Sequence, residues 1–106
     1  MTSVNVSVQN MTNGKFLGVY DNVSVKPGTS IYDIMVQLQS DGSTNFSFQA
    51  TGAQPNHTIT VINGLQEDTI KKLKWNYYIN NSIGNKSVDA YNPADGSSIQ
   101  WQYEHY

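Results

Sequence analysis

One stretch of the chain, residues 31–38, repeats its apolar side chains at the spacing of a helix, and this limits the fold more than any other feature. These apolar residues stand at positions i, i+3, i+4 and i+7 and therefore share one helix face: Ile31, Ile34, Met35 and Leu38. Thr29-Ser30 offers an N-cap with Asp33 three residues beyond Ser30, and Gly42 marks the expected end. A single helix needs a sheet face against which to bury this stripe.

The rest of the chain supplies strands, because polar and apolar residues alternate in most of it with a period of two. The expected strands are 3–9, 16–25, 45–51, 58–62, 75–80 and 99–104. Asn13-Gly14 lies between the first two strands and favours a hairpin, since both positions tolerate a positive φ. The polar and charged residues 66–74 form either a loop or one helical turn.

The second expected strand carries its apolar residues on one parity: Leu17, Val19, Val23 and Val25. Asp21 falls on the same parity and interrupts the series, so we expect a bulge or a bend at this position.

The order of these elements, a hairpin, one helix and then about four strands, predicts an α+β domain. We expect a β-grasp-like arrangement, in which a twisted, mostly antiparallel sheet carries the helix on one face. A chain of 106 residues suits one domain, spanning residues 1–106. Because the sequence has no cysteine, disulfides and thiolate metal sites are excluded.

Charge and hydropathy exclude two classes of partner. The chain has six lysines, no arginine and a net charge of −2, which argues against nucleic-acid binding. No apolar run approaches the roughly 18 residues that cross a membrane, and no signal peptide is visible at the N-terminus.

Neutral polar residues dominate the sequence, since Asn, Ser and Thr make up 31 of 106 residues and charged residues only 13%. Seven of the twelve asparagines open an N-x-S/T sequon, where chance gives about two: Asn5, Asn10, Asn22, Asn45, Asn56, Asn80 and Asn85. This excess predicts an exported, glycosylated protein at the cell surface; alternatively, Asn and Ser/Thr simply alternate on the wet faces of strands. The lack of cysteine favours a prokaryotic envelope over a eukaryotic secreted domain.

The sequence offers little for catalysis. His57 and His105 are the only histidines, and neither stands beside a Ser or Asp in a nucleophile pattern. Two histidines without cysteine also make a poor zinc set. Asp89 is the one acidic residue that no turn or cap explains. We therefore expect a protein that is not an enzyme and requires no cofactor.

Aromatic residues gather in the C-terminal third: Trp75, Tyr77, Tyr78, Tyr91, Trp101 and Tyr103. On paired strands they could form a flat platform for a ring or a sugar. The alternative is that Trp75, Tyr77, Trp101 and Tyr103 are the core side of two strands. Tyr78 has the opposite parity and Tyr91 lies in a connection, so these two are the better candidates for exposed contacts.

The same third of the chain carries a family resemblance. Residues 75–81 (WNYYINN), 88–91 (VDAY) and 94–101 (ADGSSIQW) resemble the small C-terminal domain of transcobalamin and intrinsic factor, and the microbial domains akin to it. The helix entry 28–35 and the preceding residues 23–25 fit the same pattern, so the resemblance spans nearly the whole chain.

This resemblance implies a β-grasp-like lid that closes over one face of cobalamin while a large helical domain holds the other face. Contacts in the family come partly from the connection that corresponds to residues 80–91 here. The ligand-binding residues that we expect are Trp75, Tyr78, Asn80, Val88, Tyr91 and Trp101. The predicted function is a non-enzymatic extracellular binding module for cobalamin or another corrinoid.

Two departures from the family pattern weaken that prediction. The carriers have a more apolar stretch where this chain has Asn85-Lys86-Ser87, and the helical partner domain is absent from the sequence. A lid alone covers one ligand face and should bind weakly.

The alternative function is a structural or adhesive module of the cell envelope that binds a protein or glycan and has no small-molecule ligand. An apolar concavity at residues 80–91 would favour the lid, and a polar edge bearing sequons would favour the adhesive module. Glycans on Asn80 and Asn85 would obstruct a close corrinoid contact.

Overall fold

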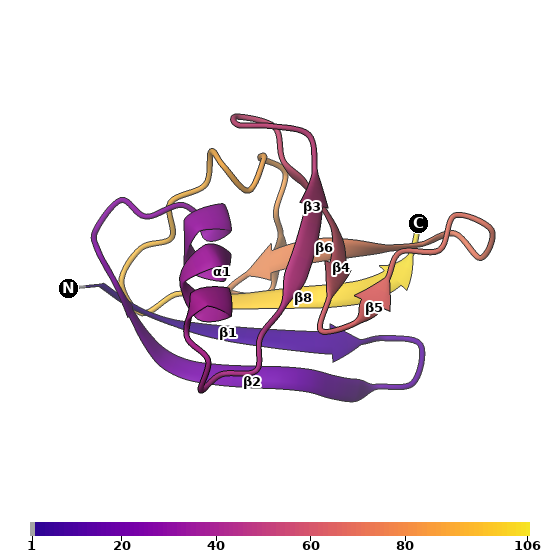
Figure 1. Ribbon diagram of the computed structural model, residues 1–106, viewed down its shortest axis with the longest axis horizontal. Helices are drawn as coiled ribbons and strands as arrows, with labels where there is room; N and C mark the ends of the chain where they lie inside the picture. The colour runs from indigo at the N-terminus through magenta and orange to yellow at the C-terminus, as the bar shows by residue number, and fades with distance from the viewer. Residues whose placement is uncertain (1) are drawn as a thin grey trace.

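The computed structural model describes residues 2–106, which form one helix and eight strands in two sheets (Figure 1). The elements are β1 (Thr2–Asn10), β2 (Lys15–Val25), α1 (Ile31–Ser40), β3 (Phe48–Thr51), β4 (Thr58–Ile62), β5 (Leu65–Gln66), β6 (Leu73–Ile79), β7 (Ser82–Ile83) and β8 (Ser98–His105). Within residues 2–106, no helix has the length and apolar character needed to cross a membrane.

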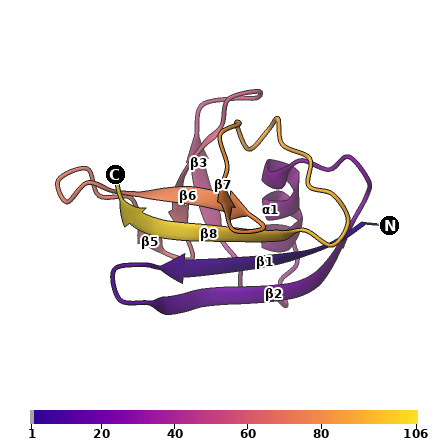
Figure 2. The same cartoon turned by 180° about the vertical axis from the view of Figure 1, so that it is seen from behind.

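The larger sheet has five strands in the order β2-β1-β8-β6-β7 (Figure 2). Its first and last strands in sequence, β1 and β8, pair in parallel at the centre, and the other neighbours are antiparallel. A hairpin, a helix that crosses the sheet and a central parallel pair define a β-grasp arrangement. The predicted fold class, α+β with one helix on a mostly antiparallel sheet, is therefore confirmed.

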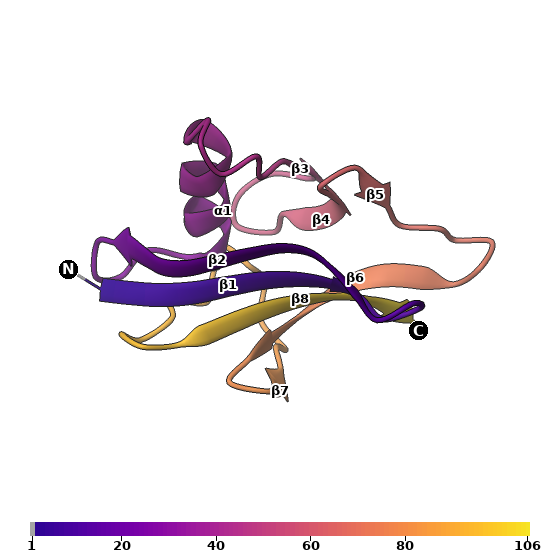
Figure 3. The same cartoon turned by 90° about the horizontal axis from the view of Figure 1, so that it is seen from below.

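A smaller antiparallel sheet, β3-β4-β5, lies beside α1 on the same face of the larger sheet (Figure 3). The core fills the space between these two layers. It takes alternate residues of β1, β6 and β8, whose burial patterns repeat every second residue. The opposite face of the larger sheet carries the polar residues of the same strands, among them Ser7, Gln100 and Gln102.

The helix confirms its sequence prediction residue by residue. Its four predicted apolar residues, Ile31, Ile34, Met35 and Leu38, are at most 4% exposed. Ser30 is the N-cap, and its hydroxyl accepts a hydrogen bond of 3.2 Å from the backbone N–H of Asp33. This bond satisfies one of the N–H groups that a helix start leaves unpaired.

Strand β2 contains the expected bulge, and the bulge overturns the expected parity. Val4 pairs with Val23 and Val6 with Tyr20, so β2 has one residue more than β1 in this interval. Asn22 takes a positive φ of 55° there. The extra residue turns Tyr20 toward the core and leaves Val19 58% exposed, so the prediction that Val19 shares the buried parity is wrong.

The polar segment 66–74 contains no helical turn. Leu65–Gln66 pair with β4 across Asn63-Gly64, both of which have a positive φ, and a turn follows before β6. Lys71, Lys72 and Lys74 are exposed, as expected of a solvated charged loop.

Candidate ligand-binding site

Four of the candidate aromatic residues belong to the core. Trp75 pairs with Tyr103 and Tyr77 with Trp101 across β6 and β8, and all four side chains face the inside of the sheet. The ring centroids of Trp75 and Tyr103 are 5.1 Å apart, and those of Tyr77 and Trp101 are 5.5 Å apart. The core interpretation of these residues is therefore correct, and they form no exposed platform.

The connection from residue 80 to residue 91 runs over one end of this core to the start of α1 (Figure 2). The hydroxyl of Tyr77 donates a hydrogen bond of 2.5 Å to the carbonyl of Lys86. The backbone N–H groups of Ile31 and Tyr32 donate to the carbonyls of Tyr91 and Val88, at 3.0 and 3.1 Å. The connection therefore occupies the helix N-terminus and is fixed along its length.

Asp89, which the sequence left unexplained, ties this connection to the loop before β4. Its carboxylate accepts a bond of 2.8 Å from the backbone N–H of His57 and lies 2.9 Å from His57 Nδ1. The His57 ring also stacks on Tyr32 with a centroid distance of 4.0 Å, and Ser87 Oγ donates to the carbonyl of Pro55.

The environment of Asp89 acts on its pKa in two directions. Its side chain is 2% exposed, and this burial by itself raises the pKa. The hydrogen bonds from the backbone N–H and the ring of His57, together with electrostatic attraction to that ring, outweigh burial and lower the pKa of Asp89 below its ordinary value. The carboxylate therefore stays ionised and holds the two loops together.

A cleft of about 170 Å³ lies between the connection, β4 and the sheet. Its walls include three of the expected binding residues, Trp75, Val88 and Trp101, together with His57 and Lys86. Gly84 also lines the cleft, and a Cβ at this position would overlap the Tyr77 ring.

The two tryptophans of the cleft differ in their hydrogen bonding. Trp75 Nε1 donates to the carbonyl of Leu65 at 2.9 Å. Trp101 Nε1 is buried and has no hydrogen-bond partner among residues 2–106. The cleft is thus lined by one satisfied and one unsatisfied indole.

The other three expected binding residues lie outside this cleft. Tyr91 is half-buried with its ring against Tyr77, at 6.2 Å between centroids. Asn80 is exposed at the β6–β7 turn, where its side-chain oxygen accepts a bond from the backbone N–H of Ser98. Tyr78 lies on the opposite face of the sheet, so it does not join Trp75 and Trp101.

On that opposite face the hydroxyl of Tyr78 donates a bond of 2.5 Å to the carboxylate of Glu104, which also accepts from Asn76 at 2.8 Å. The bond to Glu104, followed by burial and by repulsion from the same charge, raises the pKa of Tyr78 to about 12. Tyr78 therefore stays protonated at neutral pH and fixes Glu104 in place.

The exposed surface of the connection is polar with one apolar tip. Ile83 in β7 is 59% exposed, and Asn81, Asn85 and Lys86 are exposed around it, whereas Val88 is buried. Within the described part of the chain, residues 2–106, no group of three or more His, Asp or Glu side chains is placed to hold a metal ion.

Sequence reasoning missed His57, Lys86 and Ser87 as residues of the cleft. Asp89 stood out as unexplained, but its partner His57 is 32 residues away, and neither spacing nor periodicity signals such a contact.

Comparisons with known proteins agree with this architecture. Residues 28–105 match the family DUF4430, which is described as a domain of unknown function. A crystal structure of haptocorrin in complex with Cbi superposes with a TM-score of 0.82 and 23% identity over 99% of this chain. The chain spans about a quarter of the length of that haptocorrin, 25%.

A second structure comes from Ruminococcus gnavus ATCC 29149 and is of a protein proposed to bind metal. It superposes with a TM-score of 0.77 and 14% identity, over 100% of this chain and 99% of its own. Both neighbours are described by what they bind. No curated protein matches the chain in sequence.

Proposed function

The chain belongs to the family DUF4430, and from this membership together with its fold we propose that it is a non-enzymatic binding module, one domain over residues 1–106. Its ligand is a corrinoid, and the connection 80–91 contacts one face of that ligand.

The observation that carries this proposal is the rigid anchoring of an exposed connection. Its backbone is fixed by Tyr77, by the first two N–H groups of α1 and by the Asp89–His57 pair. A surface that is already ordered loses little conformational entropy when a ligand binds. Such anchoring supports a contact surface better than a mobile linker would.

The chemistry of the exposed connection suits a corrinoid, a flat macrocycle with amide side chains around its rim. Ile83 offers an apolar contact for the ring, and Asn81, Asn85 and Lys86 offer hydrogen bonds to the amides. The similar haptocorrin structure holds Cbi, which supports this ligand class. One module covers only one face, so we expect weak binding unless a partner domain covers the other face.

The test is a titration of cobinamide and cobalamin into the purified chain, followed by tryptophan fluorescence with an inner-filter control. Trp75 and Trp101 line the cleft under the connection and serve as reporters. We expect saturable quenching. Ile83→Ser should weaken the affinity about tenfold, because burying an isoleucine is worth roughly 1.5–3 kcal/mol.

Ile70→Ser is the matched control, since Ile70 is 93% exposed in the turn before β6, at the opposite end of that strand from the connection. It should leave the affinity unchanged. Absence of saturation up to millimolar corrinoid, or equal effects of the two variants, would contradict the proposal.

The second candidate function is a structural or adhesive envelope module that has no small-molecule ligand and contacts a protein or a glycan. The connection has the polar edge that we expected of this alternative, with the exposed sequon residues Asn80 at its start and Asn85 near its middle. Glycans found on both residues by mass spectrometry, together with no corrinoid binding, would support this alternative.

An extracellular or cell-surface location is part of the same proposal. Five of the seven sequon asparagines are exposed in the structure: Asn22, Asn45, Asn56, Asn80 and Asn85. The low charge of the chain, 13% of residues, is in keeping with this location. Mass spectrometry of protein from its natural source would measure the occupancy of the sequons, and an unmodified, intracellular protein would contradict it.

A further inference from the structure

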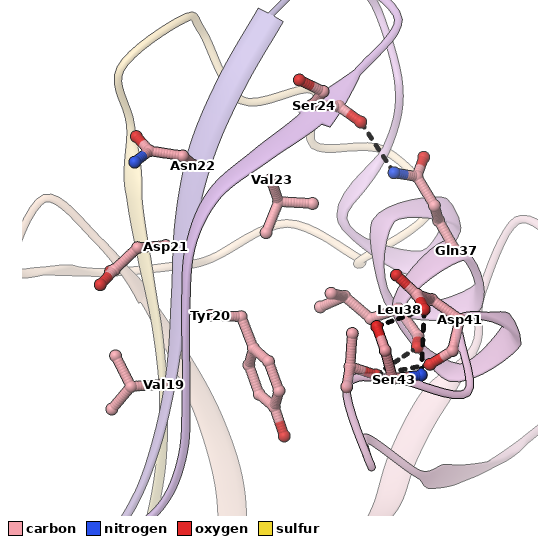
Figure 4. Close-up of a pocket in the computed structure, with 11 residues that line it drawn as sticks. Val19, Tyr20, Asp21, Asn22, Val23, Ser24, Gln37, Leu38, Asp41 and Ser43 are labelled. Atoms are coloured by element: carbon pink, nitrogen blue, oxygen red, sulfur yellow. Dashed lines mark hydrogen bonds between the residues drawn. The ribbon is translucent and has the colours of Figure 1, made fainter.

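A groove follows the free edge of strand β2 (Figure 4), at the opposite edge of the larger sheet from β7 in the connection 80–91. It consists of two adjoining hollows of about 520 and 610 Å³. Both hollows are lined by Val19, Tyr20 and Thr44, so they lie next to each other along β2. The wall facing β2 is formed by the end of α1, the following residues up to 47 and the turn Asn63-Gly64.

The backbone of β2 has hydrogen-bonding groups that face this groove. The N–H of Asn5 in β1 donates to the carbonyl of Ser97, just before β8, and the N–H of Met11, just after β1, donates to the carbonyl of Tyr103 in β8. These N–H groups therefore point toward β8. The alternate residues Val6 and Val8 therefore bond to β2, through their partners Tyr20 and Gly18. Between these partners, the N–H and C=O of Val19 point outward, away from the sheet.

Side-chain amides already cover the outward carbonyls at the two ends of this edge. Asn63 Nδ2 donates to the carbonyl of Leu17 at 3.2 Å, and Gln37 Nε2 donates to the carbonyl of Ser24 at 2.7 Å. The backbone groups of Val19 have no such cover from any residue of the described chain, 2–106. The groove thus has an open stretch of strand edge between two capped ends.

The charge of the groove is negative. Asp41 faces the groove from the end of α1, Asp21 stands beside the edge with its side chain on the other face of β2, and no lysine is among the lining residues. The backbone N–H and hydroxyl of Ser43 both donate to Asp41 Oδ1, at 3.0 and 2.7 Å, and they lower the pKa of Asp41 below its ordinary value. Its second carboxylate oxygen remains available to a cation.

The inner wall of the groove also has apolar surface. In Figure 4 the side chains of Tyr20 and Val23 point from β2 toward α1, and Leu38 faces them from the helix. Alternate residues of an added strand would point to opposite faces of the sheet. One set would therefore enter this hollow, and the other set would lie beside the exposed side chains of Val19 and Asp21.

We propose that this groove binds a short extended peptide that carries lysine or arginine and adds to β2 as a further strand. The main chain of the peptide bonds Val19, an apolar side chain contacts Tyr20 and Leu38, and a cationic side chain lies near Asp41. Strand addition of this kind is a common mode of peptide recognition. The bulge at Asn22 ends the regular edge, so the peptide needs only about four residues at ~3.3 Å each.

The charge argues for such a partner over a second copy of the chain. The chain has a net charge of −2, and pairing two β2 edges would bring the Asp21 and Asp41 residues of both copies together. Like charges placed opposite each other oppose pairing between strands.

The test uses a fluorescein-labelled peptide, Val-Lys-Val-Lys-Val, and measures anisotropy against the full chain at low and high salt. We expect saturable binding that weakens as salt rises. A Val-Glu-Val-Glu-Val peptide should bind at least tenfold more weakly. The lysine peptide with N-methylated backbone amides, which cannot form the strand hydrogen bonds, should lose most of its affinity. Equal binding of the N-methylated peptide would overturn the proposal.

Two pairs of variants test the protein side. Val19→Pro removes the outward N–H and is tolerated at an edge, so the peptide should lose at least tenfold in affinity, whereas Val19→Thr should bind normally. Asp41→Asn keeps the oxygen that accepts from Ser43 and should weaken the lysine peptide about two- to fivefold, as loss of an exposed ion pair does. Circular dichroism checks the fold of each variant.

Unchanged binding by a folded Val19→Pro variant would overturn the proposal, as would no binding of the lysine peptide at millimolar concentration. Analytical ultracentrifugation of the chain without peptide measures whether it forms a dimer. A dimer that Val19→Pro dissociates would assign the edge to a second copy and would equally overturn it. Cobinamide should not compete with the peptide, so these results are independent of the corrinoid titration.

Discussion

Gly84 shows how a single residue shapes the candidate site. It lies where the connection crosses the Tyr77 ring, and a Cβ there would overlap that ring. We expect Gly84→Ala to destabilise the fold by about 1–3 kcal/mol, because the ring or the connection must move. Urea denaturation measures this loss.

Gly42 supplies the control for that substitution, since a Cβ at position 42 meets nothing within 4 Å. Gly42→Ala should leave the stability nearly unchanged. Equal midpoints for the two alanine variants would mean that the Tyr77 contact does not restrain the connection.

Tyr78 allows a second test at the scale of one residue. Its pKa of about 12 arises first from the hydrogen bond to Glu104. Glu104→Gln should lower the Tyr78 pKa toward its ordinary 10.0, as seen in the ultraviolet titration of tyrosinate after subtraction of the Tyr78→Phe titration.

The same pair predicts how stability changes with alkali. Because the pKa of Tyr78 is raised in the folded chain, its contribution to folding stability is complete below pH 10. That contribution is lost as the pH rises through about 12. A Tyr78 that titrates near 10 in the wild-type chain would contradict the bond to Glu104.

Among the elements, the connection and the loop before β4 depend on the Asp89–His57 contact. Asp89→Asn should cost about 1–3 kcal/mol in unfolding free energy, because it weakens two hydrogen bonds to a buried carboxylate. Because the pKa of Asp89 is lowered in the folded chain, its contribution to folding stability is complete above pH 3.8. That contribution is lost as the pH falls through the lowered pKa of the folded state.

Wild-type chain should therefore lose stability on acidification below about pH 4 more steeply than Asp89→Asn does. Asp21→Asn is the control, because Asp21 is exposed on β2. Parallel pH profiles for wild type and Asp89→Asn would show that this carboxylate does not hold the loops. Urea unfolding at several pH values supplies the comparison.

Elements with a regular apolar period were predictable from the sequence, and irregular ones were not. Helix α1 and strands β4, β6 and β8 occur where the periodicity indicated. Strand β2 kept its predicted place and its bulge near Asp21, but the inserted residue exchanged the positions of Val19 and Tyr20. A period of two identifies the buried face only as far as the next bulge.

For the whole molecule, the order of hairpin, helix and strands was enough to predict the β-grasp arrangement, because the helix must cover the sheet that the first hairpin begins. The candidate site was predictable only in part. Trp75 and Trp101 share an inward parity and meet in the cleft, and Val88 joins them from the connection. The contact between His57 and Asp89 depends on how two distant loops meet, which no local pattern encodes.

The parallel pairing of β1 with β8 has a mechanical consequence. Six register pairs, from Asn5–Ser98 to Asn10–Tyr103, join the strands next to the two chain ends. Because the pairing is parallel, the start of β1 at Thr2 and the end of β8 at His105 lie at opposite ends of this pair (Figure 1). Tension between them acts along the strands and loads all of these hydrogen bonds in shear, so they must rupture together and cannot unzip one at a time. The fold is thus arranged to resist stretching.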